Sequence, residues 1–141
     1  DVKTIKRDKN ALFLDTGSPH YVELVESIDD INVRAKGSLI RNSNRYKNNG
    51  VNVNFFKIIG PDTIKIRTYE RGVEDETLSC GTGAVASSIA FHFLQLTKFD
   101  KLKVETPGGT LVVEFKFNSG IYKDIYLKGP AEKVFSGKIK W

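Results

Sequence analysis

The chain has 141 residues, 40% of them hydrophobic and 28% charged, which suits one globular domain with a core of its own. No apolar run approaches the ~20 residues that a membrane-spanning helix needs, and residues 1–10 are too polar for a signal peptide. The single cysteine excludes an internal disulfide, so we expect a reducing, cytoplasmic setting with no membrane partner.

The formal net charge of +5 is the one feature that would suit a nucleic-acid-binding protein. The basic residues are scattered, however, and most of them alternate with apolar residues, which is typical of solvated strand faces. We therefore expect no nucleic-acid partner. The sequence also contains no methionine and begins with Asp1, so we expect it to be a piece of a longer protein.

The first half of the chain is rich in strand patterns. Residues 11–15, 21–26, 51–59 and 63–70 are predicted strands, and Gly60-Pro61-Asp62 predicts a hairpin turn between the last two. Residues 28–42 form a weaker helix prediction, because Asp29 and Asp30 suit a first helical turn whereas Gly37 disfavours a helix interior.

The second half begins with an apolar helix prediction over residues 81–96, whose apolar side chains cover most of its circumference. A helix of that kind is buried. His92 within it is expected at the core or its rim. Further strands are predicted over residues 101–106, 110–117, 121–128 and 132–140. The Lys-rich tail and Trp141 are expected to have a structural role. The expected fold is α+β, with a twisted, mainly antiparallel sheet wrapped around a central helix that starts at Gly81.

Cys80 lies directly before this buried helix and is followed by Gly81-Thr82-Gly83. The free N–H groups of a helix N-terminus favour a thiolate over a thiol and also bind carboxylates, so we expect a lowered pKa for Cys80 beside an anion site. Removal of an α-hydrogen from an amino acid needs such a base and such carboxylate stabilisation. From the spacing alone, a small buried apolar cysteine followed by a plain turn is the more common arrangement.

The residues from Glu70-Arg71-Gly72 to Glu76-Thr77-Leu78-Ser79-Cys80-Gly81-Thr82-Gly83-Ala84 resemble the segment around the second catalytic cysteine of the diaminopimelate epimerase family. Residues 16–22, with Ser18-Pro19-His20, are similar to the family's Gly-Asn-Pro-His segment. Residues 50–55 are similar to its Val-Asn-Val-Gly-Phe segment, and Pro107-Gly108-Gly109 and Gly129-Pro130-Ala131 to its closing strands. The resemblance covers nearly the whole chain.

The resemblance implies a cofactor-independent epimerase in which two cysteines face opposite sides of the substrate Cα, one as base and one as acid. LL-diaminopimelate and meso-diaminopimelate are interconverted in lysine biosynthesis. Residues 1–141 would be the C-terminal one of two pseudo-symmetric halves, and the N-terminal half with the other cysteine is absent. The isolated half would then be nearly inactive unless that half, or a second copy in a homodimer, completes it.

The resemblance also implies roles for single residues. Cys80 is the expected catalytic thiol, with His20 and Glu70 assisting; no metal is expected. The expected substrate-binding residues are Asn52, Arg71 at the distal carboxylate, the helix end at Gly81 and Thr82, and Ser18. Taken singly, these residues have ordinary structural explanations: Glu70 and Arg71 would be a surface pair.

Ser18 departs from the family, which commonly has asparagine there, and its shorter side chain leaves its role open. Two other functions stay open. A proline-racemase-like enzyme shares the Cys-Gly-Thr-Gly segment, but its approach to that segment differs. The second alternative is a non-catalytic half that binds a ligand or partner. Phenazine-biosynthesis-type isomerases lack the cysteine, so Cys80 argues against them.

Overall fold

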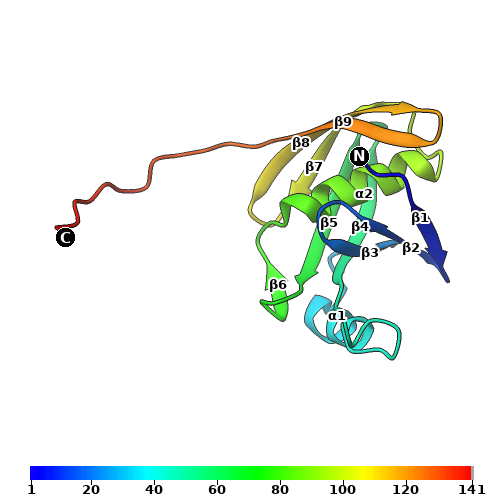
Figure 1. Ribbon diagram of the computed structural model, residues 1–141, viewed down its shortest axis with the longest axis horizontal. Coiled ribbons are helices and arrows are strands. Elements are labelled where there is room, and N and C mark those ends of the chain that lie inside the picture. The colour runs from blue at the N-terminus through cyan, green and yellow to red at the C-terminus, as the bar shows by residue number, and fades with distance from the viewer. Residues whose placement is uncertain (141) are drawn as a thin grey trace.

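The computed structural model describes residues 1–140, in which nine strands form one sheet and two helices pack on it (Figure 1). The strands are β1 (Ile5–Asp8), β2 (Ala11–Asp15), β3 (Pro19–Leu24), β4 (Asn52–Gly60), β5 (Thr63–Glu70), β6 (Asp75–Thr77), β7 (Lys101–Thr106), β8 (Gly109–Asn118) and β9 (Ile121–Lys128). The helices are α1 (Val33–Arg41) and α2 (Gly81–Phe93). The predicted α+β class is confirmed.

Helix α2 lies inside the curl of the sheet (Figure 1). Every residue from Gly83 to Phe91 is buried, as the apolar pattern predicted. The helix contacts strands of both arms of the sheet, β2 to β5 on one side and β7 to β9 on the other. Its side chains form the main core with the inward faces of those strands, including Leu14, Phe56 and Leu102, all fully buried. The N-terminus of α2 is thereby fixed within the fold.

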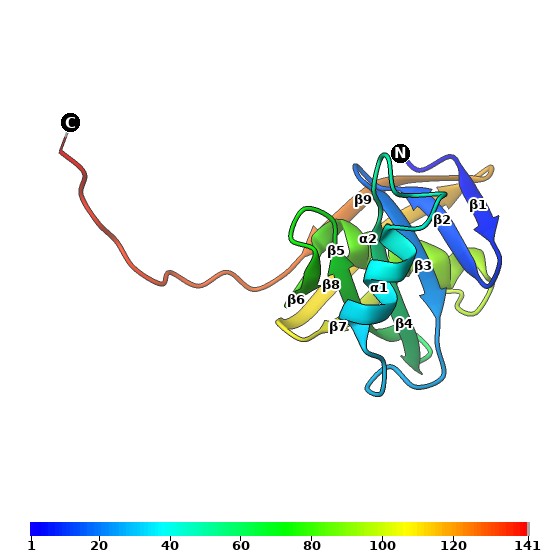
Figure 2. The same ribbon diagram turned by 90° about the horizontal axis from the view of Figure 1, so that it is seen from below.

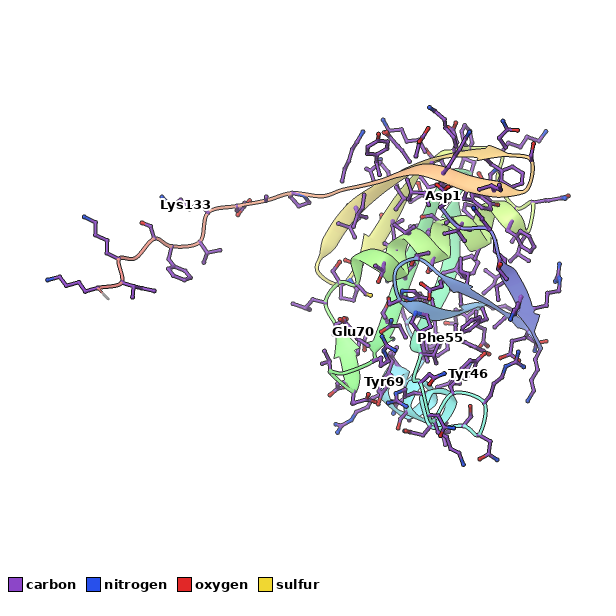
Figure 3. The ribbon with its side chains drawn as sticks, viewed as in Figure 1. Asp1, Tyr46, Phe55, Tyr69, Glu70 and Lys133 are labelled. Carbon is purple, nitrogen blue, oxygen red and sulfur yellow. The ribbon has the colours of Figure 1, made fainter. Side chains whose placement is uncertain are left out.

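Helix α1 covers the outer face of β4 and β5, so these two strands are buried on both sides. Val33, Phe55 and Tyr69 belong to a second core between this helix and the sheet, and Figure 3 shows Tyr69 near α1. Gly37 is explained by this packing, because a Cβ at that position would overlap the Tyr69 side chain. The glycine that weakens the helix prediction therefore permits the close approach of helix and strand.

The strand order is β1-β2-β3-β4-β5-β7-β8-β9, and β6 pairs with the end of β5. All neighbours are antiparallel except β3 with β4 and β5 with β7. Parallel neighbours require a crossover, and α1 and α2 lie in these two connections. Val2 and Tyr122 also exchange two backbone hydrogen bonds, of 2.8 and 3.0 Å, which join the start of the chain to the opposite edge strand β9.

Several sequence predictions need correction. The strand predicted over residues 132–140 is wrong: residues 129–140 extend away from the body of the protein without regular structure and are exposed (Figure 2). The helix predicted over residues 28–42 begins only at Val33, where the Asn32 side chain caps it by accepting from the Ala35 N–H at 3.0 Å. Strands β1 and β6 were not predicted. The structural role expected for Trp141 falls outside the described residues.

No helix within residues 1–140 is long and apolar enough to cross a membrane. The same residues contain no group of three or more His, Cys, Asp or Glu side chains arranged to hold a metal ion.

Candidate active site

Cys80 is the N-cap residue of α2, with an extended backbone (φ −124°, ψ 108°). It is only 7% exposed and directly precedes the first residue of the helix, where the sequence predicts the helix start. The next turn of the helix approaches β4 closely. A Cβ at Gly83 would overlap the Asn54 Oδ1 atom and lie 3.2 Å from Cys80 Sγ. Glycine at this position therefore lets the helix end, the sulfur and β4 come together.

The expected lowering of the Cys80 pKa is not found. Burial raises the pKa of the thiol, and the charge of Glu70 adds to that effect. The Thr82 hydroxyl, 3.6 Å from Cys80 Sγ, and the backbone N–H groups of Gly83 and Thr82 act in the opposite direction but do not outweigh burial. Cys80 in this chain is thus a thiol at neutral pH, with hydrogen-bond donors beside its sulfur.

His20 is a fully buried side chain on β3, held by the buried Asn54 of β4. Asn54 Nδ2 lies 2.9 Å from His20 Nδ1 and donates to the Tyr21 carbonyl at 3.2 Å, while its Oδ1 accepts from the Thr68 hydroxyl at 2.9 Å. Burial lowers the pKa of His20 to about 4. The imidazole is therefore neutral at physiological pH, and Nδ1 is the nitrogen without a proton.

Ser18, Asn52 and Thr82 connect His20 to the helix end. Ser18 Oγ lies 3.0 Å from His20 Nε2 and 3.2 Å from Thr82 Oγ1. Asn52 Nδ2 donates to Ser18 Oγ and to the Pro19 carbonyl, both at 3.2 Å. Since the Thr82 hydroxyl is also the neighbour of Cys80 Sγ, hydrogen bonds run without a gap from His20 to the sulfur.

Arg71 and Glu70 lie at the end of β5, on the rim of this network. The Arg71 backbone N–H donates to Asn52 Oδ1 at 2.9 Å, and its guanidinium donates to the Asn49 carbonyl at 2.8 Å while the side chain remains exposed. Glu70 Oε2 accepts from the Thr77 hydroxyl at 2.8 Å, across the β5–β6 pairing that Figure 3 shows beside it. Glu70 thus acts on Cys80 through its charge rather than through a hydrogen bond.

The structure thus brings seven of the eight expected site residues into one connected group; Glu70 joins that group only by its charge. Sequence reasoning missed two members. Asn54 orients His20, and Thr16 donates its hydroxyl proton to the Thr82 carbonyl at 2.9 Å, which ties the helix end to the loop before β3. The signal for Asn54 was its spacing of two from Asn52, which places both amides on the same strand face.

A cavity of about 610 Å³ opens beside the helix end. It is lined by Gly81 and Thr82, by Asp15 and the turn at Thr16 and Gly17, and by apolar side chains that include Val85 and Leu127. Cys80 is not part of the lining. The cavity therefore gives access to the start of α2 next to the sulfur, where free backbone N–H groups can receive an anion.

Known proteins of one family are similar to this chain over most of its length. Residues 12–134 match the family model described as diaminopimelate epimerase. Among curated proteins, the diaminopimelate epimerases of Flavobacterium psychrophilum, Chlorobaculum tepidum and Aquifex aeolicus are each 43% identical, over 99%, 92% and 91% of this chain. The aligned parts are 54%, 50% and 45% of those proteins, so the chain spans about half the length of these relatives.

Solved structures bear on the fold. A phenazine biosynthesis protein of the PhzF family from Enterococcus faecalis matches 82% of this chain and 38% of its own, with a TM-score of 0.55 at 19% identity. A PhzF-family protein from Bacillus anthracis matches 84% of this chain and 35% of its own, with a TM-score of 0.51 at 21% identity. At such low identity these likenesses concern the curled sheet and its central helix alone.

Proposed function

Because the chain belongs to the diaminopimelate epimerase family, we propose that it supplies one side of an active site that interconverts LL-diaminopimelate and meso-diaminopimelate in lysine biosynthesis. The observation that carries the proposal is the placement of Cys80 at the N-terminus of the buried helix α2, with donors around its sulfur. In this proposal, residues 1–141 are the C-terminal half of a cytoplasmic enzyme that needs no cofactor.

The proposed chemistry is a proton transfer at Cα by two cysteines. One thiolate removes the α-proton from one face of the substrate, and the thiol of the other cysteine gives its proton to the opposite face. Cys80 is the cysteine on this side. Its raised pKa suits the resting acid form, and the reverse reaction starts from its thiolate.

The substrate carboxylate at the reacting carbon takes up negative charge as the α-proton leaves. The N-terminus of α2 at Gly81 and Thr82 would stabilise it, because both residues line the cavity and a helix N-terminus attracts an anion. Arg71 is the proposed contact for the distal carboxylate, because its guanidinium is exposed and donates to the Asn49 carbonyl. Ser18 and Asn52 connect these two contacts, because Ser18 Oγ lies beside Thr82 Oγ1 and Asn52 Oδ1 accepts from the Arg71 N–H. His20 contacts Ser18, and Glu70 acts on Cys80 through its charge.

The missing side of the site makes the isolated chain a poor catalyst in this proposal. Cys80 is the one cysteine of the sequence, so the second thiol must come from the N-terminal half or from a second copy of this chain.

The test is α-hydrogen exchange in heavy water, followed by mass spectrometry of diaminopimelate. This chain joined to a matching N-terminal half should incorporate deuterium, and Cys80→Ala should slow incorporation by about 10²- to 10⁴-fold. Ser87→Ala is the matched control, because it removes a buried hydroxyl of α2 that has no hydrogen-bond partner. Exchange that is unaffected by Cys80→Ala would contradict the proposal. Exchange of the α-hydrogen of proline rather than that of diaminopimelate would identify the chain as part of a proline-racemase-like enzyme.

A further inference from the structure

Ser18 stands at the centre of the hydrogen-bond network, and the direction of each bond around it is determined by backbone groups. Asn52 Oδ1 accepts from the Arg71 backbone N–H, a group that can only donate, so the Asn52 amide must turn its Nδ2 toward Ser18 Oγ. The Asn52 side chain is therefore a donor to Ser18.

The direction at His20 is determined in the same way. Asn54 Nδ2 donates to the Tyr21 carbonyl, which can only accept, so this amide nitrogen also faces His20 Nδ1 as a donor. A neutral imidazole whose Nδ1 accepts carries its single proton on Nε2. His20 Nε2 therefore donates to Ser18 Oγ across 3.0 Å.

Ser18 Oγ thus accepts two hydrogen bonds, and a hydroxyl has two lone pairs and one proton. Its remaining neighbour is Thr82 Oγ1 at 3.2 Å, so the Ser18 proton is donated there. The Thr82 hydroxyl then accepts from Ser18, and its own proton is free for Cys80 Sγ at 3.6 Å.

We propose that Ser18 is a positioning residue that directs the Thr82 hydroxyl proton onto Cys80 Sγ and so stabilises the thiolate form of Cys80. Ser18 does not touch the sulfur and acts through Thr82. The significance of this for catalysis rests on the proposed function, but the effect on the thiol exists without substrate.

The experiment is the pH profile of iodoacetamide alkylation of the purified chain, in which Cys80 is the one reactive thiol. Ser18→Ala should raise the apparent pKa of Cys80 and slow alkylation near pH 8 about 3- to 10-fold, the loss expected for one hydrogen bond to a charged acceptor felt through a relay. Thr82→Val should slow it at least as much. Ser18→Thr, which keeps the hydroxyl, should restore the wild-type profile.

Other charged groups do not alter the difference in apparent Cys80 pKa between the variants. Glu70 on β5 raises the Cys80 pKa in every variant alike, and His20, with a pKa of about 4, stays neutral throughout the titrated range. Ser87→Ala on the same helix controls for loss of a buried hydroxyl, and circular dichroism of each variant checks its fold.

A Ser18→Ala profile that coincides with wild type would overturn the inference, and so would a shift to lower pKa. A shift in Thr82→Val without one in Ser18→Ala would show that Thr82 takes its orientation without Ser18, which also overturns it. Because no substrate is present, these outcomes are independent of whether diaminopimelate is the substrate. Failure of the exchange assay would leave the alkylation result intact.

Discussion

The buried neutral His20 makes the stability of the fold depend on pH in a calculable way. Its pKa is about 4 in the folded chain and has its ordinary value of 6.5 when exposed. Between these values the unfolded chain binds a proton that the folded chain excludes. Stability therefore rises with pH in this window and is lost as pH falls through it.

The magnitude follows from the two pKa values. Lowering the pH from 7 to 5 nearly saturates protonation of the unfolded form and leaves the folded form neutral, which destabilises the fold by about 2 kcal/mol. His20→Gln removes the titrating group, so that part of the pH dependence should disappear, although the variant is less stable at every pH because its packing is disturbed.

Urea unfolding followed by circular dichroism at pH 7 and pH 5 measures this difference. Both chains keep His92, whose pKa burial also lowers, so its contribution cancels in the comparison. Equal losses of unfolding free energy in wild type and His20→Gln between the two pH values would show that His20 is not the source of this pH dependence.

Gly83→Ala should displace Asn54 and slow Cys80 alkylation, whereas Gly137→Ala, with open space around it, should change nothing in the same assay. In the enzyme completed by its other half, Arg71→Ala should raise KM much more than it lowers kcat, and steady-state kinetics that show a loss confined to kcat would contradict its binding role. Phe115→Ala should cost about 3–5 kcal/mol and Phe135→Ala under about 0.5 kcal/mol in urea unfolding, since their exposed fractions are 3% and 85%; equal losses would mean that the tail is packed.

The strongly patterned elements were predictable from the sequence. Helix α2 has apolar residues all round, and β5 and β7 alternate apolar and basic residues, so periodicity alone places them. Strand β1 carries one apolar residue in four, and β6 is three residues long and exists through its pairing with β5. Neither contains enough pattern to be detected.

The tail shows the converse error. The sequence predicted a closing strand there because the segment contains Val134, Phe135 and Ile139. A strand forms only where the edge of a sheet is available to pair with it, and no strand within residues 1–140 pairs with this segment. The residue pattern of a segment indicates its tendency to form a strand, but it does not show whether another strand lies beside it in the fold.

The candidate site was identified by its motif segments, which lie far apart in sequence and meet at one end of α2. The motif could not give the directions of the hydrogen bonds, because these depend on the Tyr21 carbonyl and the Arg71 N–H. The sign of the Cys80 pKa shift was wrong for a related reason. The helix N-terminus is visible in sequence, whereas the depth at which the sulfur is buried depends on the whole fold.

The backbone pairing of Val2 with Tyr122 has a consequence for how the protein folds. Its two hydrogen bonds close a loop of nearly the whole chain, and the entropy cost of such a closure grows with loop length. Contacts of long sequence separation also slow folding. During synthesis Val2 cannot pair with Tyr122 before β9 has been made, and the strands between them can pair in the meantime. The first few residues of the chain are therefore among the last to find their place.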